Sequence, residues 1–199
     1  MIKNIVFDFG QVLVRFEPKY MVEQYVSDPL DSALLQEVVF DRLYWDKLDA
    51  GNITDEQTVL EIKKRIPKRL FDVAEQIYYN WIYNIPEIEG MESVVQFAKE
   101  KFAGRIFLLS NISTYFADHK AEIPILKHFD ECVFSAVCGF TKPGADIFRH
   151  ICEKYDLNPK ETLFIDDSPK NIKGAEDFSI NGYLFDGDAL RLKKYLENI

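Results

Sequence analysis

Short apolar runs recur along the chain, and several of them end in polar residues. The first run covers residues 5–9, is rich in strand-forming residues and is broken by Gly10, so it predicts a buried strand. Comparable runs predict further strands at residues 105–110, 132–137, 162–165 and 182–185. Strands that are apolar on both faces are typical of parallel sheets. The pattern therefore predicts a mostly parallel sheet.

Apolar residues at helical spacing fall between these runs. One stripe comprises Met91, Val94, Val95, Ala98 and Phe102, and another comprises Ile147, Phe148, Ile151, Cys152 and Tyr155. Ser168 followed by Pro169 predicts the start of a further helix, and residues 189–198 predict a closing one. Because strands alternate with helices, we expect an α/β fold, a Rossmann-like parallel sheet with helices on both faces.

Residues 16–88 differ from the rest because they have helical patterns and no convincing strand. Prolines punctuate this segment into about four helices; they are Pro18, Pro29, Pro67 and Pro86. Thr54, with Gln57 three residues later, predicts a helix start closed by reciprocal side-chain hydrogen bonds. We interpret residues 16–88 as a helical insert, and residues 1–15 with 89–199 as the core.

The charge of the chain bears on its partners. Its 199 residues suffice for one core and a smaller insert, and 24 basic against 33 acidic residues give a net charge of −9. Sequence-independent binding to nucleic acid needs clustered lysine and arginine, so we expect no nucleic-acid partner. Binding of a small anionic substrate depends on the charges near its site, so the negative net charge does not exclude it.

Membrane and secretion signals are not evident in the sequence. A spanning helix needs about 20 apolar residues in a row, and Asp8 interrupts the short apolar stretch near the N-terminus. We therefore expect a cytoplasmic protein with no membrane partner. The three cysteines, Cys132, Cys138 and Cys152, form no C-x-x-C pair and are expected to be buried thiols rather than disulfides or zinc ligands. The sequence leaves the oligomeric state open.

Polar residues follow three of the predicted strands: Asp8, Ser110-Asn111 and Asp166-Asp167. In open α/β sheets, ligands bind beyond the carboxyl ends of the strands. Polar loops would explain any one of these positions, but three together predict a site. Asp8 is the hardest to explain otherwise, because a carboxylate directly after a buried strand is costly unless it is paired or bound to a metal.

These residues resemble the motifs of the haloacid dehalogenase superfamily of hydrolases. The motifs, in order, are residues 7–14, residues 108–111, Lys142-Pro143 and residues 164–168. They span nearly the whole chain, and the insert between the first and second resembles the C1-type helical cap of that superfamily. The resemblance implies a phosphatase that uses Mg²⁺ and acts on a small phosphorylated metabolite.

The resemblance also implies a role for each residue. Asp8 would be the nucleophile that forms an aspartyl-phosphate and, with the backbone carbonyl of Gly10 and Asp166, would hold Mg²⁺. Asp167 would orient a water on the ion without binding it directly. Lys142 would keep Asp8 ionised and offset charge in the transition state. The Ser110 hydroxyl and the Asn111 N–H would bind phosphate oxygens.

Gly10 departs from the usual pattern, because phosphatases of this superfamily generally have a second aspartate there as general acid and base. Such a group contributes roughly 10²- to 10⁴-fold. The Asp-x-Gly motif resembles a subgroup of sugar-phosphate phosphatases and the N-terminal domains of epoxide hydrolases. An anomeric phosphate is a good leaving group that needs less acid assistance, so a sugar phosphate is our hypothesis for the substrate.

Other functions remain open. A 2-haloacid dehalogenase also lacks the second aspartate and works without metal, although the Asp166-Asp167 pair would repel its carboxylate substrate. A non-catalytic phosphate-binding relative is a further alternative, and a phosphomutase would need the missing acid most.

The cap is expected to set substrate specificity. Candidate residues are Arg15, Phe16, Tyr44, Trp45 and the turn at residues 50–52. The alternative is that the aromatic residues only pack in the hydrophobic core of the cap. Arg15 could equally be a charged residue at the surface, exposed to solvent.

Overall fold

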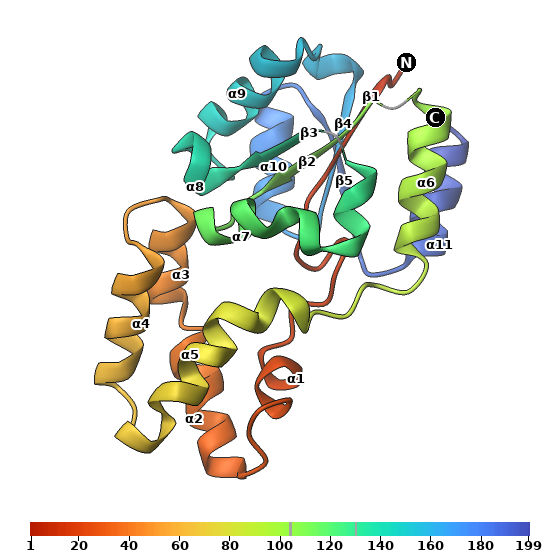
Figure 1. The fold of residues 1–199 in the computed structure, drawn as a ribbon. Helices are drawn as coiled ribbons and strands as arrows, with labels where there is room; N and C mark the ends of the chain where they lie inside the picture. The colour runs from red at the N-terminus through yellow and green to blue at the C-terminus, as the bar shows by residue number, and fades with distance from the viewer. Residues whose placement is uncertain (104, 130) are drawn as a thin grey trace.

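A five-stranded parallel sheet forms the centre of the core in a computed structural model that describes residues 1–103, 105–129 and 131–199 (Figure 1). Its strands are β1 (Asn4–Phe7), β2 (Ile106–Ser110), β3 (Glu131–Phe134), β4 (Thr162–Asp166) and β5 (Asn181–Leu184). They lie in the order β3-β2-β1-β4-β5, and every neighbouring pair is parallel. The predicted parallel α/β sheet is confirmed.

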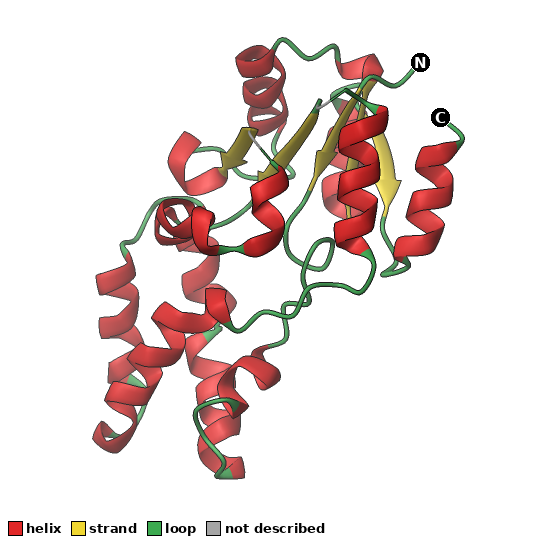
Figure 2. Ribbon diagram, turned by 45° about the vertical axis from the view of Figure 1, so that its right-hand side comes forward, coloured by secondary structure: helices red, strands yellow, loops and turns green. Residues whose placement is uncertain are grey.

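Helices cover both faces of this sheet (Figures 1 and 2). Helices α9 (Ala145–Tyr155) and α10 (Pro169–Asp177) lie on one face, and α6 (Met91–Lys101) and α11 (Ala189–Glu197) on the other. Successive strand residues divide between two apolar clusters: Val6 packs with α9 and α10, whereas Ile5 and Phe7 pack with α6 and α11. This alternation is what a strand buried on both faces requires.

Shorter helices complete the core. They are α7 (Thr114–His119), α8 (Ser135–Cys138) and the 3₁₀ turns η3 (Lys120–Glu122), η4 (Pro124–His128) and η5 (Pro159–Glu161). No helix among the described residues has the length and apolar character needed to cross a bilayer.

The third strand is shorter than predicted. It ends at Phe134, and the residues that we expected to extend it form α8 instead. The Ile112 N–H donates to the Ser135 hydroxyl at 2.8 Å, and Gly139, at a φ of 79°, ends the helical turn. Val137, whose side chain made the segment look like a strand, is 63% exposed.

The insert is helical, as predicted. Its helices are α1 (Pro18–Glu23), α2 (Pro29–Val39), α3 (Arg42–Asp49), α4 (Asp55–Lys64) and α5 (Phe71–Asn80), with 3₁₀ turns η1 (Lys68–Leu70) and η2 (Trp81–Tyr83). The Thr54–Gln57 capping pair begins α4. The described residues of the insert form five α-helices where about four were predicted. The Asp41 side chain accepts the Leu43 N–H at 2.9 Å and starts α3 as a helix separate from α2.

Several contacts join this cap to the core, among them its two linkers and the turn after α3. The entering and leaving chains run side by side, with the Arg15 N–H donating to Pro86 O at 2.8 Å and the Ile88 N–H to Leu13 O at 2.9 Å. The turn after α3 also packs against α8: a Cβ added to Gly51 would lie 3.0 Å from the Ala136 carbonyl oxygen. The cap therefore meets the core at both its linkers and the tip of α3.

The Gly51 contact predicts a specific loss of stability. Gly51 has a φ of +70°, so Gly51→Ala incurs the left-handed backbone cost of about 1–2 kcal/mol and about 1–3 kcal/mol more for crowding against α8. Gly187→Ala is the matched control, because its φ is +88° and nothing lies within 4 Å of an added Cβ. Urea unfolding measures both variants, and equal losses would contradict the contact between α3 and α8.

Candidate active site

Two neighbouring strands bring the acidic residues together. Asp8 follows β1 and Asp166 ends β4, and because these strands pair in register, the Asp8 N–H donates to Ile165 O at 2.9 Å. Oxygen atoms of Asp8, Asp166 and Asp167 all lie within 4.8 Å of one another. Asp8 and Asp166 are buried, whereas Asp167 is exposed. Three carboxyl groups that are distant in sequence thus meet at one edge of the sheet.

Lys142 joins two of these carboxylates. Its ammonium lies 2.7 Å from Asp8 Oδ1 and 2.8 Å from Asp166 Oδ2, and the side chain is almost fully buried. The Asn111 side chain fixes the backbone of the lysine: Nδ2 donates to Lys142 O at 2.9 Å, and Oδ1 accepts the Lys142 N–H at 2.8 Å. The residue after β2 therefore positions the ammonium against Asp8, which follows β1, and Asp166, which ends β4.

Asp166 is also held from its other side. Its Oδ1 accepts the Ser168 N–H at 2.8 Å and the Asn171 Nδ2 at 3.0 Å. Ser168 occupies the N-cap of α10 as predicted, but its side chain makes no capping hydrogen bond. Sequence reasoning missed Asn171, although a polar residue in the first turn of the helix that follows Asp166 was a visible signal.

Burial and charge shift the pKa values of these groups. Burial raises the pKa of Asp8 to about 7, although the Lys142 charge lowers it; the Asp166 charge raises it further. Burial alone would lower the pKa of Lys142, but the charges of Asp8 and Asp166 outweigh it and raise this pKa. For Asp167, whose residue is exposed but whose carboxyl is partly shielded from water, this partial desolvation and then the Asp166 charge raise the pKa. One ammonium thus faces three carboxyl groups, and a cation would relieve their mutual repulsion.

The donor chemistry of the cluster fits Mg²⁺, which prefers hard oxygen ligands such as carboxylates. Asp8 and Asp166 were predicted as ligands and lie side by side. Asp167, which we expected to act through a water, has an oxygen within 4.8 Å of oxygens of both Asp8 and Asp166. The distances therefore permit three carboxylate ligands as well as two. Gly10, the predicted carbonyl ligand, lies two residues beyond Asp8 and lines the adjacent cavity.

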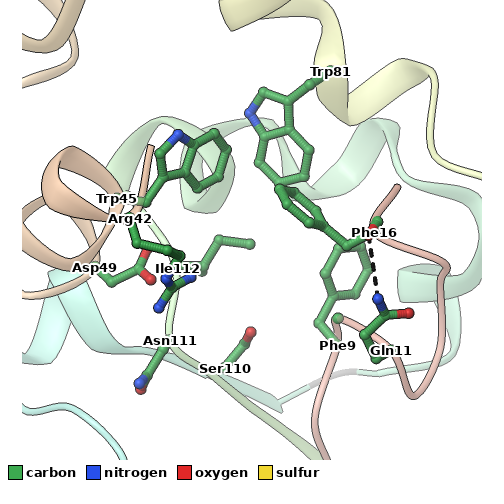
Figure 3. Close-up of a pocket in the computed structure, with 11 residues that line it drawn as sticks. Phe9, Gln11, Phe16, Arg42, Trp45, Asp49, Trp81, Ser110, Asn111 and Ile112 are labelled. Atoms are coloured by element: carbon green, nitrogen blue, oxygen red, sulfur yellow. Dashed lines mark hydrogen bonds between the residues drawn. The ribbon is translucent and has the colours of Figure 1, made fainter. Parts of the chain in front are cut away.

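A cavity of about 190 Å³ lies between this edge of the sheet and the cap (Figure 3). Its walls comprise Phe9, Gly10, Gln11, Ser110, Asn111 and Ile112 from the core, and Phe16, Arg42, Trp45, Asp49 and Trp81 from the cap side. The Ser110 hydroxyl points into it and has no hydrogen-bond partner in the described part of the chain (Figure 3). The cavity thus presents the polar side chains of Ser110 and Asn111 from the core, and aromatic rings together with two charged groups from the cap.

The four predicted specificity residues separate into two groups. Phe16 and Trp45 line the cavity, with ring centroids 5.4 Å apart. Arg15 instead lines a neighbouring groove with Asp167, and Tyr44 is buried beside Arg65, whose guanidinium carbon is 5.6 Å from its ring centroid. The turn at residues 50–52 is not part of the cavity lining.

Sequence reasoning missed two charged residues of the cap wall, Arg42 and Asp49. Together with Trp45 they lie at spacings of three and four on α3, so all three share one helix face. That spacing was the available signal, since Trp45 was itself a candidate.

The sequence from residue 2 to residue 178 matches the haloacid dehalogenase-like hydrolase family. The chain belongs to this family. It is therefore a haloacid dehalogenase-like hydrolase, as the order of its motifs predicted.

Known relatives of this hydrolase include a D-ribitol-5-phosphate phosphatase of Bacteroides thetaiotaomicron, which is 24% identical over 185 residues covering 86% of each chain. Among solved structures, a protein of Porphyromonas gingivalis predicted to be a HAD-like family hydrolase has a TM-score of 0.69 at 26% identity, covering 92% of this chain and 90% of its own.

Two more distant structures share the fold. A HAD family enzyme of B. thetaiotaomicron, solved with magnesium and inorganic phosphate, has a TM-score of 0.68 at 22% identity and covers 92% of this chain and 93% of its own. The L-2-haloacid dehalogenase of Xanthobacter autotrophicus has a TM-score of 0.65 at 17% identity, covering 92% and 76%. The hydrolase thus shares its fold with both a phosphate-bound enzyme and a dehalogenase.

The buried ion pairs of Lys142 predict a large loss of stability on their removal. Lys142→Met leaves Asp8 and Asp166 without their shared cation, and such a break costs about 3–5 kcal/mol. The matched control is Lys173→Met, which removes an exposed pair with Asp177 and should cost at most about 1 kcal/mol. Urea unfolding in metal-free buffer measures both. Equal losses would contradict the compensating role of Lys142.

Proposed function

We propose that this hydrolase is a Mg²⁺-dependent phosphatase that cleaves a small phosphate monoester through an aspartyl-phosphate on Asp8. The observation that carries the proposal is the Lys142 ammonium between Asp8 and Asp166, beside a cavity into which the Ser110 hydroxyl points. This arrangement combines a carboxylate nucleophile, a fixed positive charge and a free hydrogen-bond donor, as phosphoryl transfer demands. The similarity to a ribitol-phosphate phosphatase supports it.

The two oxygens of Asp8 suit different tasks. Oδ1 accepts the Phe9 N–H at 2.7 Å and contacts Lys142, whereas Oδ2 has no hydrogen-bond partner among the described residues. Fixing one oxygen sets the orientation of the carboxylate. An oxygen of Asp8 attacks the phosphorus, and the bond from phosphorus to the leaving alcohol breaks. Water then attacks the aspartyl-phosphate and releases inorganic phosphate.

The remaining residues bind the phosphoryl group. The Ser110 hydroxyl, the Asn111 N–H and the Lys142 ammonium donate hydrogen bonds to its oxygens, and they offset charge that develops in the transition state. Asp8, Asp166 and the Gly10 carbonyl would hold Mg²⁺, which when bound supplies positive charge that lets the anionic nucleophile approach the phosphate. Asn111 has a second task, because its side chain holds the Lys142 backbone.

The cavity favours a compact leaving group. At about 190 Å³ it is smaller than the roughly 300–1,000 Å³ of typical ligand pockets. The rings of Phe16, Trp45 and Trp81 form one wall, with Arg42 and Asp49 beside them. Aromatic faces together with charged hydrogen-bonding groups suit a short polyol or sugar, so we propose a polyol or sugar phosphate as the substrate.

A dehalogenase function is the main alternative, since a dehalogenase shares the fold. Its 2-halocarboxylate substrate would add another carboxylate to Asp8, Asp166 and Asp167, whose oxygens already lie within 4.8 Å of one another. Like charges this close disfavour each other. Chloride release from 2-chloropropionate, measured beside phosphate release, distinguishes the two activities.

Removal of the nucleophile gives the principal prediction for activity. Asp8→Asn retains the shape of the side chain but not its nucleophilic charge, so phosphate release should fall by on the order of 10³-fold or more. The assay is a panel of phosphate esters with Mg²⁺ and with EDTA, and EDTA should abolish release by the unsubstituted enzyme. Asp118→Asn, an exposed change on α7, is the control. Undiminished turnover by Asp8→Asn would refute the mechanism, and no turnover on any ester would favour a non-catalytic phosphate-binding protein.

A further inference from the structure

A carboxyl group faces the cavity from the cap. Asp49 is the last residue of α3, is only 6% exposed and lines the cavity (Figure 3). Within the described residues its side chain has no hydrogen bond or ion pair. By contrast, the cap residues Asp31 and Asp41 pair with arginines, and Asp55 accepts a hydrogen bond from Tyr78. Every fully buried side-chain oxygen among the described residues has a hydrogen-bond partner, so the unpartnered Asp49 carboxyl reaches the space of the cavity. A carboxyl group so largely removed from water is costly to the fold, which points to a functional reason for its presence.

The core side of the cavity lacks such a group. Gly10 lies on that side, and Asp49 is the one carboxyl-bearing residue among those that line the cavity in the described structure. Ser110 and Asn111, the candidate phosphate ligands, lie on the opposite wall from the cap (Figure 3). A phosphate held there would have its leaving group in the cavity, which Asp49 lines from the cap.

The surroundings of Asp49 suit proton transfer near neutral pH. Burial raises its pKa from the ordinary 3.8 to about 7, while the charge of Arg42 lowers it, that of Asp46 raises it and that of Lys142 lowers it. These are the charged groups that act on it from α3 and from the core. A general acid and base works best when its pKa lies near the working pH.

We propose that Asp49 is the general acid and base of this enzyme. The cap would supply it in place of the second aspartate that phosphatases of this superfamily generally have at the position of Gly10. The proposal rests on the phosphatase function above. As Asp8 forms its bond to phosphorus and the phosphorus–alcohol bond breaks, the carboxyl proton of Asp49 moves to the leaving oxygen, which departs as the alcohol. The Asp49 carboxylate then takes a proton from the water that attacks the aspartyl-phosphate. Asp8 is released, inorganic phosphate leaves, and Asp49 is protonated again.

The dependence of rate on the leaving group tests this role. A series of substituted phenyl phosphates changes the basicity of the leaving oxygen with little change in shape. Asp49→Asn should lower kcat/KM by roughly 10²-fold or more for basic leaving groups and far less for p-nitrophenyl phosphate. A plot of log kcat/KM against the pKa of the leaving group should therefore be steeper for Asp49→Asn than for the unsubstituted enzyme. Asp72→Asn, the same change at an exposed position of α5, should follow the unsubstituted enzyme.

The outcomes separate this proposal from the function on which it rests. A steeper dependence in Asp49→Asn supports the proposal. An equal loss for every leaving group means that Asp49 only binds substrate or maintains the cap, and no loss means that it is not involved; both results overturn the proposal. If the unsubstituted enzyme releases phosphate and Asp8→Asn does not, the proposed function stands whichever result is found.

A stability measurement gives a readout that does not depend on turnover. Because the pKa of Asp49 is higher in the folded protein than in the unfolded chain, folding stability falls as pH rises from about 4 to about 7. Asp49→Asn removes this loss, so the variant should gain stability relative to the unsubstituted protein across that interval. Parallel curves in urea unfolding would show that the carboxyl does not titrate near neutral pH, and would overturn the proposal.

Discussion

The site depends on the two buried ion pairs that the Lys142 ammonium makes with the carboxylates of Asp8 and Asp166. Charges removed from water need a partner, and the partners here come from three separate segments of the chain. The parallel pairing of β1 with β4 sets the two carboxylates side by side, and the Asn111 side chain after β2 anchors the lysine backbone. The sheet thus places the proposed nucleophile and its counter-charge at one edge, where three carboxyl groups lie close to one lysine and their oxygens suit a divalent cation.

The cap completes the site by adding a wall that the sheet lacks. Its linkers run side by side, and the tip of α3 rests on α8 through Gly51. One face of α3 therefore meets the cavity with Arg42, Trp45 and Asp49. Under the proposed function, the strand ends carry out the phosphate chemistry and the cap recognises the leaving group. If Asp49 transfers the proton, the two parts also share the catalysis.

The sequence was most informative where local pattern decides the structure. Apolar runs that end in polar residues predicted the strands and a site at their ends that contains Asp8 and Asp166. The resemblance of the motifs added Lys142 to the predicted site. The end of β3 was not predictable, because the hydrogen bond from the Ile112 N–H to the Ser135 hydroxyl joins residues that are distant in the sequence. The cap residues were predicted only in part: Phe16 and Trp45 line the cavity, but Arg42 and Asp49 were missed, since the helix face that meets the core is set by packing between cap and core.

The central claim is that Asp8 carries the phosphoryl group during turnover, and rapid acid quenching tests it most directly. Enzyme mixed with Mg²⁺ and a substrate labelled in the phosphate is quenched within one turnover, digested and analysed by mass spectrometry. The account predicts a phosphoryl group on the peptide that contains Asp8, and none on that peptide in the Asp8→Asn variant. Turnover without any labelled peptide, or with the label on a different residue, would contradict it.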